Sequence, residues 1–314
     1  MILIIGGLGF IGMNTALRFL EVGEKVVITQ HESRRVPDVI EREIGGRLRT
    51  ARMDVTNPYE VFEVARRHQV ESIVNLMAPP ARSVSTQADY RLYTVGLQNV
   101  LEAARTLGLR RVSLGSSVAV YFGLPGPYRE DMPLPVHSPT QVSAFKKGME
   151  IHAHYYAEQA KLDVVALRIG SIYGPLYYSM HNPISRMCHA AVKDAEPVFN
   201  DRPGSTIYKD DLSDWTYVKD VARCIQLVHM AQTLPHRVYN IASGRASSLR
   251  EAFEAVGKVV PGARCPALKP GRSPGALVNP AMDLSHAKKV GYQPEHTLQS
   301  GIAAYIDWLR TNPQ

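Results

Sequence analysis

Short apolar runs alternate with amphipathic stretches through the first half of the chain. An apolar run of four to eight residues between turn residues predicts a buried strand, and apolar positions three to four apart predict a helix. We expect strands at Ile2–Ile5, Lys25–Thr29, Arg47–Met53, Ser72–Leu76, Arg111–Leu114 and Val164–Arg168. We expect helices at Ile11–Val22, Tyr59–His68, about Thr86–Leu107 and about Thr140–Lys161.

This regular alternation of strand and helix decides the fold class. Parallel strands joined by helical crossovers are covered by helices on both faces, and right-handed crossovers wind such a sheet in two directions. We therefore predict an α/β protein with a Rossmann-type, doubly wound parallel sheet.

The texture of the sequence changes after Gly174-Pro175, where prolines begin to interrupt short segments. That pattern predicts a smaller, loop-rich C-terminal substrate domain. Two later extended segments, Trp215–Val218 and Val238–Ile241, could rejoin the main sheet. We expect residues 1–174 plus about 215–242 to form the dinucleotide-binding domain, and residues 175–214 plus 243–314 to form the substrate domain.

Composition narrows the functional classes. The 314 residues are 45% hydrophobic and 21% charged, which is ordinary for a soluble globular protein. The net charge of +7 comes from scattered residues without a basic tail, so we expect no nucleic-acid partner. No apolar run is long enough for a signal peptide or a membrane span. Three distant cysteines fit no zinc spacing, so we expect no metal site and a reducing, cytoplasmic location.

A glycine-rich turn joins the first strand to the first helix. Gly6 allows the tight turn, Gly9 lets the backbone approach a pyrophosphate, and Gly12 lets the helix pack on the strand. Phe10 and Ile11 open a helix whose free N–H groups and dipole favour phosphate. A glycine triplet alone is a weak indication, but its position between strand and helix favours dinucleotide binding over an unliganded turn.

The end of the second strand selects the form of the dinucleotide. A carboxylate usually stands there to bind the ribose 2′-hydroxyl, but this chain has the neutral Gln30. Arg34 and Arg35 follow, and guanidinium groups pair well with a 2′-phosphate. This favours NADP over NAD. In the alternative, Glu32 holds the ribose and the two arginines are a solvated loop.

The end of the third strand carries a further cofactor candidate. Asp54, followed by Val55, could accept a hydrogen bond from the adenine amino group. A turn or helix-capping role for Asp54 is the alternative.

Four segments carry a family resemblance, and they run nearly from end to end. They are Gly6–Gly12 (Gly-Gly-x-Gly-Phe-Ile-Gly), Ser116–Tyr121 (Ser-Ser-x-x-Val-Tyr), Leu167–Pro175 (Leu-Arg-x-x-x-x-Tyr-Gly-Pro) and Asp214–Ala222. The chain resembles the extended short-chain dehydrogenase/reductases, the group of NAD-dependent epimerases and dehydratases. The segments are specific for the fold and much less specific for the substrate.

The resemblance implies a serine, a tyrosine and a lysine as the catalytic set. Ser117 matches the serine and Lys146 the lysine that binds the nicotinamide ribose and lowers the tyrosine pKa, and Glu150 continues the match. The tyrosine position, four residues before the lysine, holds Val142. No other tyrosine in the chain stands four residues before a lysine. Because valine cannot transfer a proton, the acid/base must come from elsewhere or be unnecessary.

Substitutes for the missing phenol are available. Tyr93 falls where the family often has an asparagine, on the long helix whose start faces the active site. Tyr121 and Tyr173 lie in matched segments and are expected to be packing residues.

Substrate contacts are expected from Ser117, Ser171, Tyr177, Tyr178 and His181, the last three on a loop that could reach the site. Ser171 and Ser213 stand where nucleotide-sugar enzymes often have an asparagine and an arginine that grips the pyrophosphate. Their small side chains weaken the case for a nucleotide sugar and make a smaller hydroxylated molecule competitive.

These observations predict an NAD(P)-binding enzyme that carries out redox-linked chemistry on a hydroxylated or keto small molecule, including sugar-like ones. The reaction would be an oxidation, reduction, epimerisation or dehydration with a non-standard acid/base. A non-redox lyase, isomerase or cyclase on the same scaffold is one alternative, and a non-catalytic cofactor-binding protein is another. The resemblance also implies a homodimer formed through the two long helices.

Overall fold

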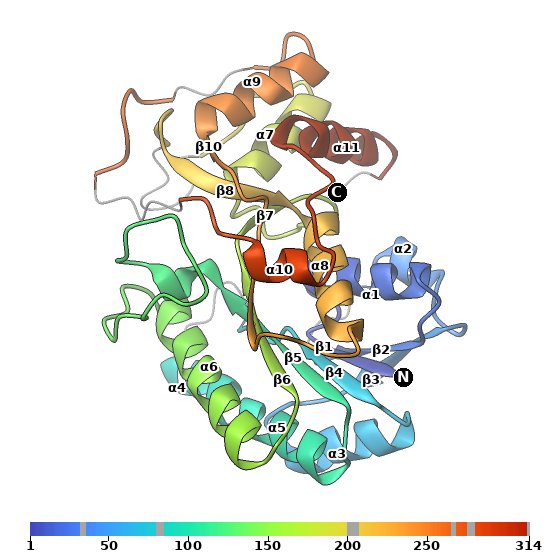
Figure 1. Ribbon diagram of the computed structural model, residues 1–314. Helices are drawn as coiled ribbons and strands as arrows, with labels where there is room; N and C mark the ends of the chain where they lie inside the picture. The colour runs from blue at the N-terminus through green and yellow to red at the C-terminus, as the bar shows by residue number, and fades with distance from the viewer. Residues whose placement is uncertain (32–35, 80–84, 200–206, 265–267, 275–279, 313–314) are drawn as a thin grey trace.

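Seven parallel strands form the central sheet in the computed structural model, which describes all residues except 32–35, 80–84, 200–206, 265–267, 275–279 and 313–314 (Figure 1). The strand order is β3-β2-β1-β4-β5-β6-β9. The strands are β1 (Ile2–Ile5), β2 (Val26–Gln30), β3 (Leu48–Arg52), β4 (Ser72–Asn75), β5 (Arg111–Ser117), β6 (Val164–Ile169) and β9 (Val238–Ile241). The order reverses direction between β1 and β4, which confirms the doubly wound Rossmann-type prediction.

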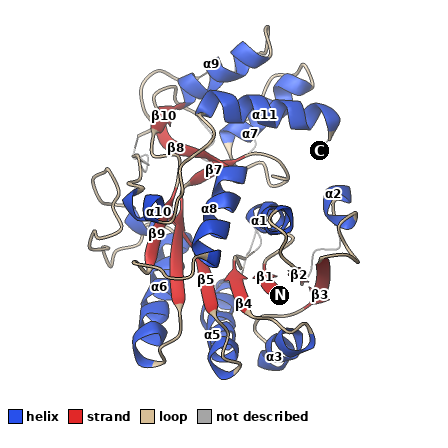
Figure 2. Ribbon diagram, turned by 45° about the vertical axis from the view of Figure 1, so that its right-hand side comes forward, coloured by secondary structure: helices blue, strands red, loops and turns tan. Residues whose placement is uncertain are grey.

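Helices cover both faces of this sheet, as Figure 2 shows. One layer contains α1 (Phe10–Glu21) and α8 (Val218–Met230), and the other contains α3 (Pro58–Arg67), α5 (Leu97–Thr106) and α6 (Gln141–Gln159). Alternate strand residues serve the two layers: Ile2 and Ile4 join one core, whereas Leu3 and Ile5 join the other. Burial on both sides explains why the central strand β1 is apolar throughout.

The helix expected over Thr86–Leu107 is divided into three parts. A π-helical turn, η1 (Leu92–Gly96), separates α4 (Thr86–Arg91) from α5. Gly96 ends this turn against the sheet, where an added Cβ would lie 2.9 Å from Val55 Cγ1. Such turns insert one residue into a helix and are frequent at functional sites. Tyr93 lies within it.

A second, smaller unit lies above the carboxyl edge of the sheet in Figure 1. Its three strands are β7 (Ser171–Tyr173), β8 (Leu212–Tyr217) and β10 (Ala246–Ser248), and its helices are α7 (Pro183–Val192), α9 (Leu249–Val259) and α11 (Leu298–Thr311). The expected extended segment Val238–Ile241 does join the main sheet, as β9. The segment around Trp215 instead belongs to β8 of the small sheet, and Val218 already begins α8. Short elements complete the chain: α2 (Asp38–Glu41), the 3-10 turn η2 (Val118–Tyr121) and α10 (Ser285–Lys289).

Asp214 of β8 ties the two units together. Its buried carboxylate accepts hydrogen bonds from the backbone N–H groups of Ser243 at 2.9 Å, Gly244 at 3.0 Å and Met282 at 3.1 Å. Burial raises the pKa of Asp214, while these donors act in the opposite direction. One side chain of the small sheet therefore holds the chain where it leaves β9 and where it approaches α10.

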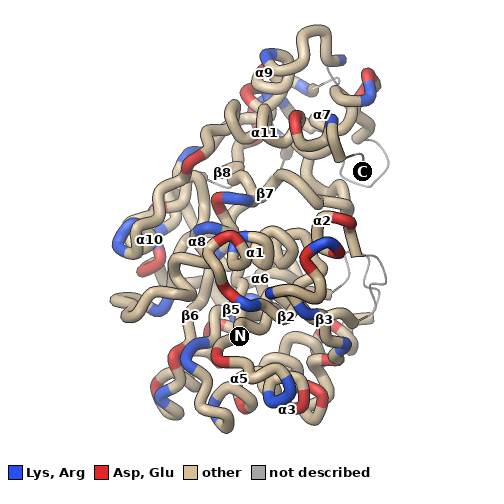
Figure 3. The backbone as a smooth tube through the Cα atoms, turned by 90° about the vertical axis from the view of Figure 1, so that its right-hand side faces the viewer, with Lys and Arg blue, Asp and Glu red and all other residues tan. Residues whose placement is uncertain are grey.

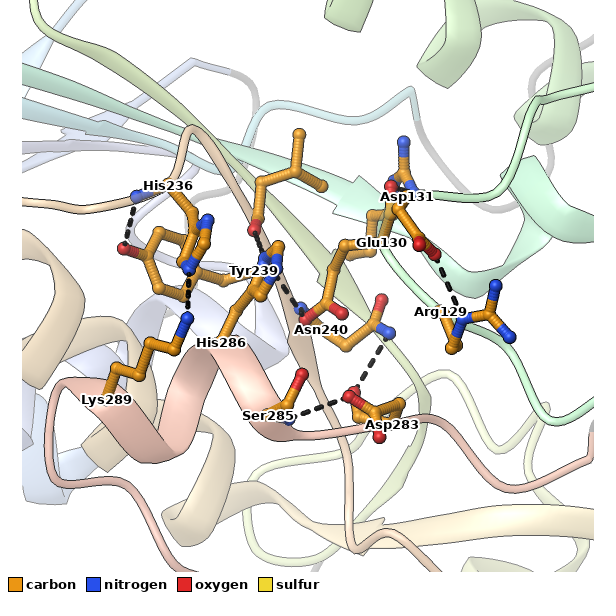
Figure 4. A network of polar contacts seen from close by, with 12 residues as sticks. Arg129, Glu130, Asp131, His236, Tyr239, Asn240, Asp283, Ser285, His286 and Lys289 are labelled. Atoms are coloured by element: carbon orange, nitrogen blue, oxygen red, sulfur yellow. Dashed lines mark hydrogen bonds and ion pairs between the residues drawn. The ribbon is translucent and has the colours of Figure 1, made fainter.

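Side chains cover the outer edge of β9, the last strand of the main sheet (Figure 4). His286 of α10 donates from Nδ1 to the Val238 carbonyl at 2.9 Å, and Glu130 accepts from the Asn240 N–H at 2.9 Å. His236 stacks on His286 with ring centroids 3.5 Å apart. An uncovered edge strand is a template for aggregation, so these contacts protect the sheet.

Positions of basic and acidic residues are intermixed along the backbone in the view of Figure 3. None of the helices in the described parts of the chain has the length and apolar composition needed to cross a membrane. Those same parts contain no group of three or more His, Cys, Asp or Glu side chains arranged to hold a metal ion.

The first prediction concerns the contact between the glycine loop and α1. A Cβ at Gly12 would collide with the Gly6 carbonyl oxygen and come within 2.8 Å of Gly7 Cα. We expect Gly12→Ala to lower the free energy of unfolding by about 1–3 kcal/mol and to weaken dinucleotide binding, because the loop must shift. Urea unfolding and cofactor titration measure the two effects.

Gly257→Ala, in α9, is the matched control, because a Cβ there meets nothing within 4 Å. Alanine in a helix interior should stabilise by about 0.5–1 kcal/mol and leave cofactor binding unchanged. If the two variants had the same free energy of unfolding and the same affinity for the cofactor, the close approach of α1 to the glycine loop would be refuted.

Candidate functional site

The glycine loop at the end of β1 has the geometry of a phosphate cradle. Gly6 adopts a positive φ of 76°, and the Gly9 N–H donates to the Gly6 carbonyl at 2.9 Å, which closes the turn. Gly9 is the N-cap of α1 and supplies no side-chain cap. The N–H groups of the first turn of a helix lack intrahelical partners, so Phe10, Ile11 and Gly12 present donors together with the positive end of the dipole. These residues fit a dinucleotide pyrophosphate.

Lys146 reaches from α6 to the carboxyl ends of β4 and β5. Its Nζ donates to the Gly115 carbonyl at 2.6 Å and to the Met77 carbonyl at 3.5 Å. The side chain is buried, and burial lowers the pKa of Lys146 to about 8, while the charge of Glu150 opposes that shift. An ammonium group at this edge can bind ribose hydroxyls of a dinucleotide held by the glycine loop.

A buried ion pair anchors this part of α6. Glu150, one turn after the lysine, pairs with Arg168 of β6 at 2.7 Å and accepts a hydrogen bond from Ser116. Arg168 also donates to the Tyr121 hydroxyl at 2.7 Å, which in turn donates to Asn240. The sequence showed Glu150 as part of the helix match but did not reveal this pairing. An arginine inside an otherwise apolar strand was the one available indication of a buried carboxylate.

Ser117 ends β5 two residues after the carbonyl that Lys146 contacts. Its Oγ accepts from the Ala119 N–H at 3.2 Å and so caps η2. The side chain is partly exposed, and its O–H donates to none of the described residues. A substrate oxygen can therefore accept a hydrogen bond from Ser117 without disturbing the turn.

Val142 stands in the first turn of α6, one turn before Lys146, with 43% of its surface exposed. An isopropyl group there neither donates nor accepts a proton. Tyr93 packs beside the lysine, with Lys146 Nζ 5.1 Å from the centre of its ring. The structure thus brings Tyr93, the suggested substitute, against Lys146.

The residues expected to bind the adenosine ribose and the adenine lie at the ends of β2 and β3. Gln30 ends β2, and its carbonyl accepts from the Met53 N–H at 3.1 Å. Asp54 Oδ1 accepts hydrogen bonds from both the N–H and the hydroxyl of Thr56, at 2.8 Å each. These bonds form a local turn, which is the alternative role considered for Asp54. Val55 is buried beside it. The predictions for Arg34 and Arg35 lie outside the described residues.

The loop after β7 approaches the glycine loop. The ring of Tyr177 lies 4.5 Å from that of Phe10, centre to centre. Asn14 of α1 donates to the Pro175 carbonyl at 3.1 Å, which fixes the start of the loop. Tyr178 and His181 follow on this loop and are exposed.

The two serines expected near the substrate contact each other. Ser213 of β8 donates to the Ser171 hydroxyl of β7 at 2.6 Å. Neither side chain carries a charge, so the pair can hydrogen-bond a substrate but cannot clamp a phosphate as a guanidinium does. Tyr121 and Tyr173 are fully buried, as expected for packing residues.

Comparison with known proteins identifies the family. The model of the NAD dependent epimerase/dehydratase family matches residues 2–242, which include the glycine loop, Ser117 and Lys146. The chain belongs to this family.

Similar proteins match the chain over nearly its full length. Protein CapI of Staphylococcus aureus is 27% identical, with 98% of this chain and 97% of that protein covered. A probable UDP-glucuronate 4-epimerase of Rhizobium meliloti (strain 1021) is 25% identical, with 99% of this chain and 97% of that protein covered. The solved structure of MoeE5 in complex with UDP-glucuronic acid and NAD is 28% identical, has a TM-score of 0.80, and covers 99% of each chain.

Membership of this epimerase/dehydratase family confirms the main functional prediction. The protein is an enzyme that binds a nicotinamide dinucleotide and carries out redox-linked chemistry on a hydroxylated or keto small molecule. The non-redox and non-catalytic alternatives find no support among these relatives.

The second prediction follows from the burial of Lys146. Because Lys146 holds its proton less tightly in the folded protein than in the unfolded chain, its contribution to the stability of the wild type rises between about pH 8 and pH 10. Lys146→Met removes this effect. We expect the free energy of unfolding of the variant, relative to the wild type, to fall by about 1.4 kcal/mol per pH unit across that interval. Chemical denaturation at several pH values measures it.

The neighbouring Lys147 provides the control. Its Nζ donates to the carbonyls of Pro135 at 2.6 Å and His137 at 2.9 Å, and to Ser138 at 3.2 Å. Lys147→Met should destabilise the protein at neutral pH by about 1–3 kcal/mol, since it leaves these acceptors without a donor. If the difference in free energy of unfolding between Lys146→Met and the wild type did not change with pH, the burial of the Lys146 amine would be refuted.

Proposed function

We propose that the enzyme transfers a hydride between a bound nicotinamide dinucleotide and a carbinol or carbonyl carbon of a sugar-like substrate, with Lys146 and Ser117 as contact residues. Lys146 binds the nicotinamide ribose, and Ser117 donates a hydrogen bond to the substrate oxygen. The observation that carries this proposal is the buried ammonium of Lys146 at the carboxyl edge of β5. It contacts the carbonyl of Gly115, which is two residues before Ser117 in the strand. When bound, the nicotinamide accepts and returns the hydride.

A similar protein and the serine pair both bear on the class of substrate. MoeE5 was solved with UDP-glucuronic acid, which makes UDP-sugars the first compounds to test. The uncharged Ser171–Ser213 pair argues that this chain does not bind a diphosphate through those two positions. Turnover of UDP-glucuronic acid in the presence of dinucleotide, followed by product separation, tests the reaction. Loss of turnover in Lys146→Ala is the expected outcome.

For the cofactor we propose a preference for NADP. Gln30 supplies no carboxylate at the end of β2, so nothing at that position repels a 2′-phosphate. The loop after Gln30 also carries two arginines in the sequence.

The third prediction tests this preference by titration of the protein with NADPH and NADH. We expect both nucleotides to bind, NADPH more tightly than NADH. The carboxylate introduced by Gln30→Asp would repel the 2′-phosphate of NADPH, so we expect this substitution to shift the ratio of the two affinities toward NADH by about tenfold. Gln30→Asn, which adds no charge, is the control. If neither nucleotide binds more tightly than about 1 mM, the proposed function is wrong.

We also propose a homodimer formed through α6 and the α4–α5 segment. Ile151 and Tyr155, one turn apart on α6, are 67% and 63% exposed, and Tyr90 on α4 is 59% exposed. Apolar side chains that share a helix face and meet solvent indicate a surface that another chain covers.

The fourth prediction is that Ile151→Asp converts a dimer into a monomer at micromolar concentration. Sedimentation velocity makes the measurement. Val136→Asp, at an equally apolar but 97% exposed position on a different segment, should leave the dimer intact. A wild-type protein that sediments as a monomer would exclude this interface.

A reducing, cytoplasmic location is our proposal for the cell. Cys188 and Cys224 are free and buried, and burial raises the pKa of both thiols. Thiols kept protonated and unpaired are typical of proteins in reducing compartments.

A further inference from the structure

Tyr93 packs against α6 beside Lys146. The π-helical turn η1 aims its side chain at α6, where its ring stacks on that of Phe145 with centroids 4.7 Å apart and planes 17° apart. Lys146 Nζ lies 5.1 Å from the centre of the same ring. Two neighbouring residues of α6 therefore fix the phenol between the helices.

The hydroxyl of Tyr93 has no hydrogen-bond partner in the described parts of the chain. Tyr93 as a whole is 97% buried, but its hydroxyl oxygen is not completely enclosed by protein atoms. Solvent therefore reaches this oxygen. A buried tyrosine normally places its O–H on a partner. An unpaired and accessible O–H beside a buried ammonium is a group that a ligand can complete.

The first turns of α6 lie close to Tyr93, because Phe145 stacks on its ring. Asp89, one turn earlier on α4, is near enough for its charge to act on the phenol. Asp89 also accepts a hydrogen bond from Gln141, the residue before Val142. Tyr93 thus lies beside the end of α6 where the acid/base of the site is missing.

We propose that Tyr93 is the acid/base of this site, supplied by the helix opposite α6. The inference rests on the proposed function. In the reductive direction the Tyr93 O–H bond breaks and its proton passes to the carbonyl oxygen of the substrate, while the carbonyl carbon gains the hydride and the nicotinamide is oxidised. In the oxidative direction the phenolate oxygen takes the proton of the substrate hydroxyl, and the hydride returns to the nicotinamide.

The protonation state of Tyr93 favours one direction in the free protein. Burial, and after it the charge of Asp89, raise the pKa of Tyr93 to about 12. The side chain is therefore a phenol at neutral pH and is ready to donate. Binding of an oxidised dinucleotide, whose nicotinamide ring is positively charged, stabilises the phenolate and prepares the oxidative step.

The fifth prediction compares Tyr93→Phe with Tyr90→Phe. Tyr93→Phe keeps the stacked ring and removes only the hydroxyl, so the variant should fold with unchanged cofactor affinity. We expect its kcat with UDP-glucuronic acid and NADP to fall about 10²–10⁴-fold. Tyr90 also contacts Phe145, with ring centres 6.3 Å apart, but is largely exposed, and its variant should keep wild-type kcat.

A spectroscopic titration tests the same inference without turnover. The tyrosinate absorbance of the wild type minus that of Tyr93→Phe reports this one phenol. Saturating NADP⁺ should lower its apparent pKa by about one unit or more, whereas NADPH should not. A phenol that titrates identically with and without NADP⁺, or a Tyr93→Phe variant with wild-type kcat, overturns the inference. Failure of the wild type to bind either NADP⁺ or NAD⁺ would instead refute the proposed function.

Discussion

The site depends on a charged amine held in a buried position. Lys146 has little access to water, and removing an ammonium group from water is costly unless polar groups replace the solvent. The Gly115 carbonyl does so at the end of β5, and the carboxylate of Glu150 supplies the opposite charge one turn along α6. The position of α6 over β5 and β6 is thereby coupled to the position of the functional amine.

The Glu150–Arg168 pair extends that constraint into the sheet. Both side chains are buried, and removal of either would leave the other charged and unpaired, which is strongly destabilising. Ser116 and Tyr121 occupy the remaining hydrogen-bonding positions. The polar layer behind Ser117 and Lys146 therefore keeps the two residues at fixed places on neighbouring elements, as a site that orients a substrate requires.

Local sequence patterns predicted the elements whose character is set locally. Strand β1 occupies the expected Ile2–Ile5, because a run of four apolar residues that ends at a glycine turn is too short for a helix and is buried as a strand. The π-helical turn in Leu92–Gly96 could not be predicted, since the apolar spacing of the long helix continues through it. The sheet that receives Trp215 was also hidden, because an extended segment does not reveal its partner strand. The residues Ser117 and Lys146 came from motifs, but the proximity of Tyr93 to the lysine depends on packing between helices far apart in the sequence.

The attachment of Asp214 has a consequence for how a substrate enters. Its carboxylate joins the small sheet to the segments on either side of the β9 edge, and the Asn14–Pro175 hydrogen bond adds a second link beside the glycine loop. A rigid-body swing of the upper unit would break both links and leave a buried carboxylate without donors. Admission of a bulky molecule without loss of these hydrogen bonds therefore requires rearrangement of surface segments, such as the one that carries Tyr178 and His181, rather than separation of the two units.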